Sequence, residues 1–188
     1  MIDFNKIIDF FYPEANKLRD ILLVHSKGVA QLAAEILDRH PELQANREIV
    51  IAGAMIHDIG IRNCDAAGIE CYGSEPYICH GILGADMIRK NQNALSLTLE
   101  ESETLARICE RHTGTGLTKK QIKSQNLPLP HCNLTPETIE EQIICYADKF
   151  FSKTHPEKMK SYDKAVRSLQ KFGEEGLVIF ERWHKKFG

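Results

Sequence analysis

The chain has 188 residues, 43% of them hydrophobic and 27% charged, with 24 Lys and Arg against 26 Asp and Glu and a formal net charge of -2. This length and composition are typical of one compact domain and exclude a disordered or collagen-like chain. The nearly balanced charge gives no electrostatic reason to expect a nucleic acid duplex or an anionic membrane as partner, which favours small ligands.

Residues 1–9 interrupt their apolar positions with Asp and Lys, so no export signal is predicted. The longest apolar run, residues 49–56, is far shorter than the ~20 residues that cross a bilayer. We therefore expect a cytoplasmic protein with reduced cysteines. A zinc site made by Cys64, Cys71 and Cys79 is an alternative, but their spacing is far wider than that of zinc-ribbon pairs.

Apolar residues recur at helical spacing along the whole chain, and no strand alternation with an Asn-Gly or Asp-Gly turn is found. The sequence predicts an all-α fold, a single-domain helical bundle with its site between the central helices. Residues 1–19 are expected to form an N-terminal helical extension. Residues 20–153 are expected to form the main domain, and residues 154–188 a C-terminal helical extension packed on it.

The first half of the chain places polar residues on apolar helical faces. A predicted helix over residues 18–37 carries His25 on its apolar stripe. A short, nearly all-apolar helix over residues 47–57 ends at His57-Asp58, and Gly60 follows as a terminator. Residues 64–74, rich in Gly, Cys and Asp, are expected to form a loop close to the site.

The second half repeats this arrangement. A helix over about residues 76–90 contains the small residues Gly81, Gly84 and Ala85, which suit close helix packing around His80. Thr98 and Glu101 form a capping-box pattern before a helix whose buried face includes His112.

Further start signals follow His112. Thr118 with Gln121 is expected to cap a short helix, and Thr135-Pro136-Glu137 is expected to open another, with Asp148 on its inner face. The last segment, residues 156–187, is predicted to be helical, with a break marked by Gly173 and Gly176.

Buried histidines and aspartates need partners, because an unpaired charge is costly to bury. One or two divalent metal ions would supply them, since imidazole and carboxylate groups are ligands for Fe, Mn, Zn, Mg or Ni. Four other histidines, next to prolines or lysines, are expected to lie outside the site: His40, His131, His155 and His184.

The order of these motifs resembles the HD superfamily in its HDIG branch: His25, then His57-Asp58-Ile59-Gly60, His80, His112 and Ala147-Asp148-Lys149. Residues 111–114 and 146–149 are similar to the YqeK-type dinucleoside tetraphosphate hydrolases. The Gly-rich turn after His112, a Leu-Pro pair and Pro-Glu-Thr-Ile-Glu-Glu are similar to a group of uncharacterised HDIG proteins. The likeness spans residues of about 20–153, which would then be the HD domain.

The resemblance implies a ligand set. His25, His57, Asp58 and Asp148 would hold a first metal, and Asp58 would bridge to a second metal held by His80 and His112. Many family members have lysine after the HDIG glycine, but here Ile61 and Arg62 follow.

Side chains near these ligands are candidates for substrate contacts. Arg62 either takes over phosphate binding or is a solvated loop residue, and Lys149 likewise either faces a phosphate or coats the surface. Asp58, Arg62 and Lys149 are the candidate catalytic residues. Arg62, Thr113, Gly114 and Lys149 are the candidate substrate contacts.

The function expected from this resemblance is metal-dependent hydrolysis of a phosphoester or phosphoanhydride in a small, nucleotide-like molecule by metal-activated water. Two alternatives remain open: an HD-type di-iron oxygenase, and a nucleotide-binding sensor without turnover. Substrate, native metal and oligomeric state, a homo-oligomer included, are not decided by the sequence.

Overall fold

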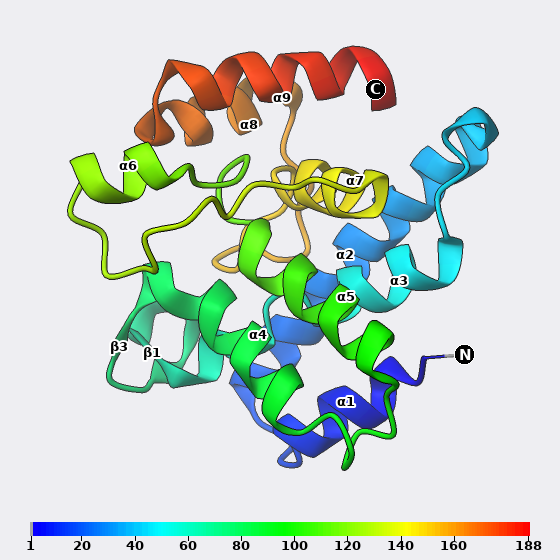
Figure 1. Cartoon of the computed structure of the whole chain (residues 1–188), viewed down its shortest axis with the longest axis vertical. Coiled ribbons are helices and arrows are strands. Elements are labelled where there is room, and N and C mark those ends of the chain that lie inside the picture. The colour runs from blue at the N-terminus through cyan, green and yellow to red at the C-terminus, as the bar shows by residue number, and fades with distance from the viewer. Residues whose placement is uncertain (1) are drawn as a thin grey trace.

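The computed structural model describes residues 2–188, and α-helices dominate this part of the chain (Figure 1). The predicted all-α class is confirmed. The α-helices are α1 (Phe4–Phe11), α2 (Lys17–Arg39), α3 (Arg47–Ile56), α4 (His80–Lys90), α5 (Leu99–Arg111), α6 (Lys119–Ser124), α7 (Ile139–Asp148), α8 (Tyr162–Leu169) and α9 (Glu174–Phe187). Short 3₁₀ turns are η1 (Pro41–Leu43), η2 (Ile59–Asn63), η3 (Ala67–Ile69), η4 (Tyr77–Cys79) and η5 (Gln170–Phe172).

Helix α3 lies at the centre of the bundle and contacts α1, α2, α5 and α7. Its N-terminus is capped by the side chain of Asn46, which accepts hydrogen bonds from the backbone N–H groups of Glu48 and Ile49. Its apolar residues are buried on several sides, as expected for a helix with little polar surface. Because of this position, His57 and Asp58, which directly follow α3, are buried in the interior.

Glycines allow the helices beside α3 to approach closely. A Cβ on Gly60 would lie 2.0 Å from the carbonyl oxygen of His80, and a Cβ on Gly81 would lie 2.6 Å from the carbonyl oxygen of Cys109. Any larger residue at these points would force the backbones apart. The Gly60 contact joins η2 to α4, and the Gly81 contact joins α4 to α5.

The capping boxes predicted at Thr98 and Thr118 are both present. The helix predicted to open at Thr135-Pro136-Glu137 begins instead at Ile139, with Thr138 as its cap. That prediction was wrong because Thr138 and Glu141 form a capping box, and Oε2 of Glu141 also accepts a hydrogen bond from the backbone N–H of Glu137, which fixes the start of the helix at Ile139.

The loop predicted over residues 64–74 contains short strands. β1 (Cys64–Ala66) pairs antiparallel with β2 (Cys71–Tyr72) and parallel with β3 (Glu75–Pro76), in the order β2-β1-β3. Asp65 pairs with Tyr72, and Cys64 pairs with Glu75. Strands of two or three residues are too short to leave an alternating pattern, so the sequence could not reveal them.

The C-terminal helices pack above α7, with α9 lying across that end of the molecule (Figure 1). Tyr146 of α7 and His184 of α9 form a hydrogen bond of 2.7 Å between the phenol oxygen and Nδ1. The predicted break occurs at Gly173, whose φ is +89°, but Gly176 lies inside α9 and does not interrupt it. No helix among residues 2–188 is both long and apolar enough to span a bilayer.

Candidate metal centre

Three histidines of the site share one arrangement. Each lies at a helix end, and its ring Nδ1 is 2.7 Å from the backbone carbonyl oxygen three residues earlier. A carbonyl only accepts hydrogen bonds, so Nδ1 carries a proton, and in the neutral ring Nε2 is left with a free lone pair. The pairs are His57 with Ala54, His80 with Tyr77, and His112 with Cys109.

These Nε2 atoms face Asp58, whose side chain is fully buried. Oδ2 of Asp58 lies 2.9 Å from Nε2 of His57 and 3.0 Å from Nε2 of His25. Oδ1 lies 3.4 Å from Nε2 of His80 and 3.3 Å from Nε2 of His112. Each oxygen of one carboxylate therefore faces its own pair of histidines.

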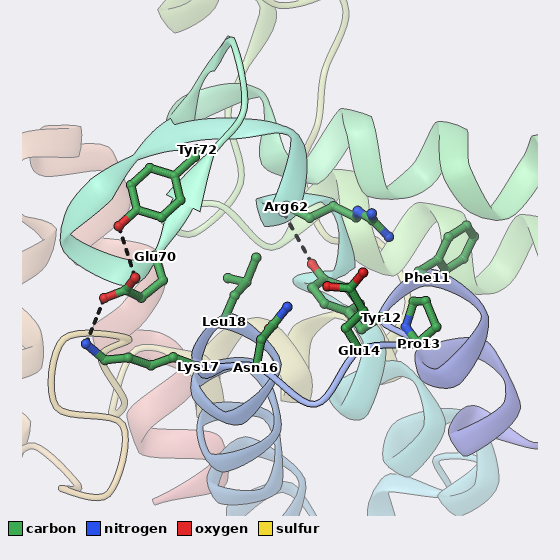
Figure 2. Close-up of a pocket in the computed structure, with 10 residues that line it drawn as sticks. All are labelled: Phe11, Tyr12, Pro13, Glu14, Asn16, Lys17, Leu18, Arg62, Glu70 and Tyr72. Carbon is green, nitrogen blue, oxygen red and sulfur yellow. Dashed lines mark hydrogen bonds and ion pairs between the residues drawn. The ribbon is translucent and has the colours of Figure 1, made fainter.

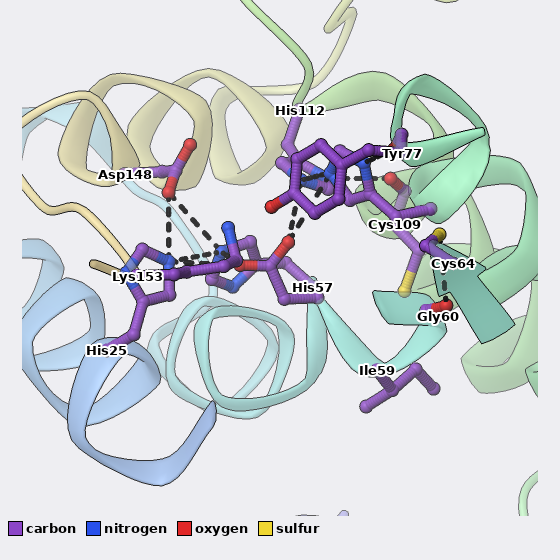
Figure 3. Close-up of polar contacts among 12 residues, drawn as sticks. His25, His57, Ile59, Gly60, Cys64, Tyr77, Cys109, His112, Asp148 and Lys153 are labelled. Atoms are coloured by element: carbon purple, nitrogen blue, oxygen red, sulfur yellow. Dashed lines mark hydrogen bonds and ion pairs between the residues drawn. The ribbon is translucent and has the colours of Figure 1, made fainter. Parts of the chain in front are cut away.

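Asp148, the last residue of α7, completes the first pair, with Oδ1 at 3.1 Å from Nε2 of His25. Side chains that could share a metal ion form two groups (Figure 3). One group contains His25, His57, Asp58 and Asp148, and the other contains Asp58, His80 and His112. These side chains lie on α2 and α7, at the first residue of α4, and directly after the ends of α3 and α5.

The residues fit one or two divalent cations. Lone pairs of the histidines point at carboxylate oxygens, and among residues 2–188 neither oxygen of Asp58 has a hydrogen bond of acceptable geometry. Such an arrangement of acceptors is repulsive without a cation or protons between them. Imidazole and carboxylate oxygen donors suit the divalent metals named above.

Charge on the metal-free site is distributed unevenly. Burial alone would raise the pKa of Asp58, but the neighbouring His57 and Lys153 cations hold it well below its usual range. Burial alone would lower the pKa of His57, but Asp58 and Asp148 raise it to about 9. Burial and the neighbouring His112 lower the pKa of His80 to about 3. His80 is therefore neutral at pH 7, the form that binds metals.

Lys149 does not coat the surface. Its ammonium is buried and donates to the carbonyl oxygen of His112 at 2.9 Å and to Oδ2 of Asp148 at 2.7 Å. Burial would lower its pKa, but the adjacent Asp148 raises it, so Lys149 stays charged. The structure thus places Lys149 beside the candidate ligands.

Sequence reasoning missed Lys153. Its Nζ lies 2.6 Å from Oδ2 of Asp58 and 5.8 Å from the centroid of the Tyr77 ring, which stacks on His80 (Figure 3). The side chain is only 12% exposed. Residue 153 follows α7 in a segment without helical periodicity, so no pattern indicated that its side chain turns back to Asp58.

Thr113 and Gly114 line the same cavity of about 180 Å³ as His80, His112 and Asp148. Arg62 does not. Its guanidinium carbon lies 5.4 Å from the centroid of the Tyr12 ring, and its side chain lines a separate cavity of about 410 Å³ with Glu14, Lys17 and others (Figure 2). The structure brings the other candidate site residues together but leaves Arg62 apart from them.

The cysteines and the remaining histidines form no second centre in residues 2–188. The thiols of Cys64, Cys71 and Cys79 each approach a different backbone carbonyl, and no group of metal-binding side chains contains them. The four histidines expected outside the site, His40, His131, His155 and His184, do not belong to either metal-binding group.

The fold is a mainly helical bundle that brings histidines and aspartates from helices and helix ends together around one carboxylate, which defines a protein with a candidate metal centre. The HD domain model matches residues 22–152, and the chain belongs to the HD domain family. Members of this family are metal-dependent proteins of hydrolase type that bind divalent ions.

Three curated proteins are similar to this chain over most of its length. The chain is 33% identical over 133 residues to a tRNA (cytidine(56)-2'-O)-methyltransferase of Picrophilus torridus, covering 71% of this chain and 32% of that protein. It is 30% identical over 167 residues to the protein of that name in Thermoplasma volcanium, covering 88% and 41%. An uncharacterised protein of Methanocaldococcus jannaschii is 29% identical over 158 residues, covering 83% and 79%.

The chain therefore spans less than half the length of the two methyltransferases that it matches. No solved structure matches the chain.

Proposed function

We propose that this protein is a metal-dependent phosphohydrolase that cleaves a phosphoester or phosphoanhydride of a small, nucleotide-like molecule. The observation that carries the proposal is the position of Asp58, with one oxygen toward His25 and His57 and the other toward His80 and His112. A carboxylate placed between two sets of ligands suits a pair of metal ions.

The ligands divide between two positions. His25, His57, Asp58 and Asp148 would hold one ion, and Asp58, His80 and His112 would hold the other. Metal ions bound there would lower the pKa of a water molecule and neutralise charge on phosphate oxygens. Backbone carbonyls accept hydrogen bonds from Nδ1 of three of the histidines, and this would keep each Nε2 oriented toward its metal ion.

Cationic side chains beside the ligands support an anionic substrate. Lys149 and Lys153 place ammonium groups within 2.7 Å of Asp148 and Asp58 respectively. With the carboxylates bound to metal, these ammoniums would be free to face phosphate oxygens, and Lys can bind phosphate as a point charge. Tyr77 and Phe172 line the cavity and offer aromatic faces to an organic group.

The proposal is tested by metal analysis of the purified chain, followed by a screen of nucleotides and phosphoesters with Mn²⁺, Mg²⁺, Zn²⁺, Ni²⁺ and Fe²⁺. Because two relatives carry the name of a tRNA methyltransferase, tRNA and its nucleotides belong in this screen. Phosphate release that requires metal and is lost in Asp58→Ala supports the proposal.

Two results would contradict it. A mixed-valent di-iron centre with oxygen uptake and no phosphate release identifies an oxygenase. Tight nucleotide binding without turnover under every metal identifies a sensor.

A further inference from the structure

Four lysines line the cavity that opens onto the candidate metal centre: Lys149, Lys153, Lys160 and Lys171. Among the residues described, Asp148 is the only acidic side chain that lines it. Asp148 belongs to the ligand groups. Ammonium groups gathered in one cavity repel one another and attract an anionic ligand.

The four lysines form two pairs. The inner pair, Lys149 and Lys153, contacts the carboxylates of the metal centre. The outer pair, Lys160 and Lys171, has no carboxylate within 4.0 Å anywhere in residues 2–188. The outer lysines therefore form no ion pair with a carboxylate among these residues, which leaves them available to an anionic ligand.

The outer pair is held in place by the fold. Nζ of Lys160 donates to the carbonyl oxygens of Phe151 at 3.0 Å and Lys149 at 3.4 Å, and the side chain is half-buried. Nζ of Lys171 lies 5.1 Å from the centroid of the Phe172 ring. Both lysines, like Lys153, follow the segment matched by the HD domain model, which ends at residue 152.

The cavity has room beyond these lysines. A second cavity of about 380 Å³ shares Tyr77, Lys153 and Lys171 with the first, so the two adjoin at these residues. Its wall includes Gly68, where a Cβ would meet no atom within 4 Å. A molecule larger than phosphate can extend past Lys171 into this space.

Resting on the proposed function, we infer that the substrate carries two phosphate groups. The metals and the inner pair take the phosphate that is cleaved. Lys160 and Lys171 bind the second, so the substrate is a bisphosphate or diphosphate ester and not a simple monophosphate. A single phosphate at the metals would leave the outer ammoniums without a counter-charge, whereas a second phosphate supplies it.

The test compares binding of two probes to the metal-loaded chain of 188 residues: inorganic phosphate and the non-hydrolysable methylenediphosphonate. Affinities are measured by calorimetry, and metal content is checked after each titration. We expect methylenediphosphonate to bind at least about tenfold more tightly, the gain expected from one further charged contact. In Lys171→Gln this advantage should fall to about threefold or less, with phosphate affinity retained.

Lys171 is exposed, so its replacement should not disturb folding, and Lys160→Met is the second variant. Lys164→Gln on α8 is the matched control, because Lys164 is exposed and does not line the cavity. Equal affinity of the wild-type chain for both probes would overturn the inference, as would a preference that survives in Lys171→Gln and in folded Lys160→Met.

The readout is binding and not turnover. Absence of hydrolysis would count against the proposed function alone, and the ratio of the two affinities would still decide the inference.

Discussion

The ammonium of Lys153 lies 2.6 Å from Oδ2 of Asp58, and both side chains are largely withdrawn from solvent. Asp58 faces both pairs of histidines, so Lys153 contacts the carboxylate that lies between the two candidate metal positions. In the metal-free protein this contact compensates a buried carboxylate, because burial alone would raise the pKa of Asp58 whereas His57 and Lys153 hold it down.

Lys153→Met should destabilise the metal-free protein and spare the metal-loaded one. Breaking a buried ion pair costs up to about 3–5 kcal/mol, and the remaining cation, His57, would reduce that loss. Bound metal would replace Lys153 as the counter-charge. The measurement is thermal unfolding with and without chelator, and equal losses in both forms would contradict this role for Lys153.

The same variant should retain its metal and lose activity. We expect kcat/KM for the best phosphoester to fall by roughly one to three orders of magnitude, because a cation near the phosphate is removed. Arg62→Ala is the comparison, since Arg62 lies over Tyr12 in a different cavity. It should change kcat/KM by less than about twofold. A large loss in Arg62→Ala would show that Arg62 reaches the substrate after all.

Single-ligand variants should separate the two metal positions. We expect two ions per wild-type chain. His80→Ala should bind one ion, because it leaves the group of His25, His57, Asp58 and Asp148 intact. Asp58→Ala should bind fewer than one, because Asp58 belongs to both groups. Elemental analysis gives the ratio, and circular dichroism should show helicity close to that of the wild type. Unchanged metal content in Asp58→Ala would contradict the bridging assignment.

Gly60→Ala should disturb the second metal position through the backbone. The added Cβ would lie 2.0 Å from the carbonyl oxygen of His80 and 2.4 Å from the backbone nitrogen of Gly84, so η2 and α4 must separate. We expect a stability loss of about 1–3 kcal/mol and weaker metal binding at His80 and His112. Gly68→Ala is the control, with no atom near its Cβ. Similar unfolding curves for both variants would refute this account.

The stability of the metal-free protein should depend on pH through His57. Although burial lowers its pKa, Asp58 and Asp148 raise it to about 9, above the unfolded value of about 6.5. The protonated ring therefore stabilises the metal-free fold fully below pH of about 6.5, and this contribution is lost as the pH rises through about 9. Denaturant titrations from pH 6 to pH 9.5 should show the decline.

Metal loading provides the control for this pH dependence. A metal-bound His57 carries no proton at Nε2, so the decline assigned to it should be absent from the metal-loaded protein. Identical pH profiles for the two forms would show that His57 does not bind the metal.

Much of the fold could be read from the sequence, because its signals are local. Apolar spacing places Leu22 and Val29 on one face of α2 with His25 between them, and all three are buried. The capping boxes at Thr98 and Thr118 depend only on residues three apart. The start of α7 was misjudged because the chain offers two adjacent start signals, and Thr138 with Glu141, not Thr135-Pro136-Glu137, forms the capping box.

The sequence by itself also determined which six side chains are candidates for the site, because histidines and aspartates on buried helical faces need partners. Only the tertiary structure decided how they meet. The assignment of each Asp58 oxygen to one pair of histidines follows from the packing of α2, α3, α4 and α5 around it.

Proximity to Asp58 in the chain did not indicate which cationic side chains lie near it in the fold. Arg62 is four residues after Asp58, but a 3₁₀ turn has about three residues per turn, so four residues place its side chain about a third of a turn away from Asp58. Lys153 is far from Asp58 in the chain and touches it. The irregular path after α7 returns that ammonium to the buried carboxylate, and no periodic pattern encodes such a path.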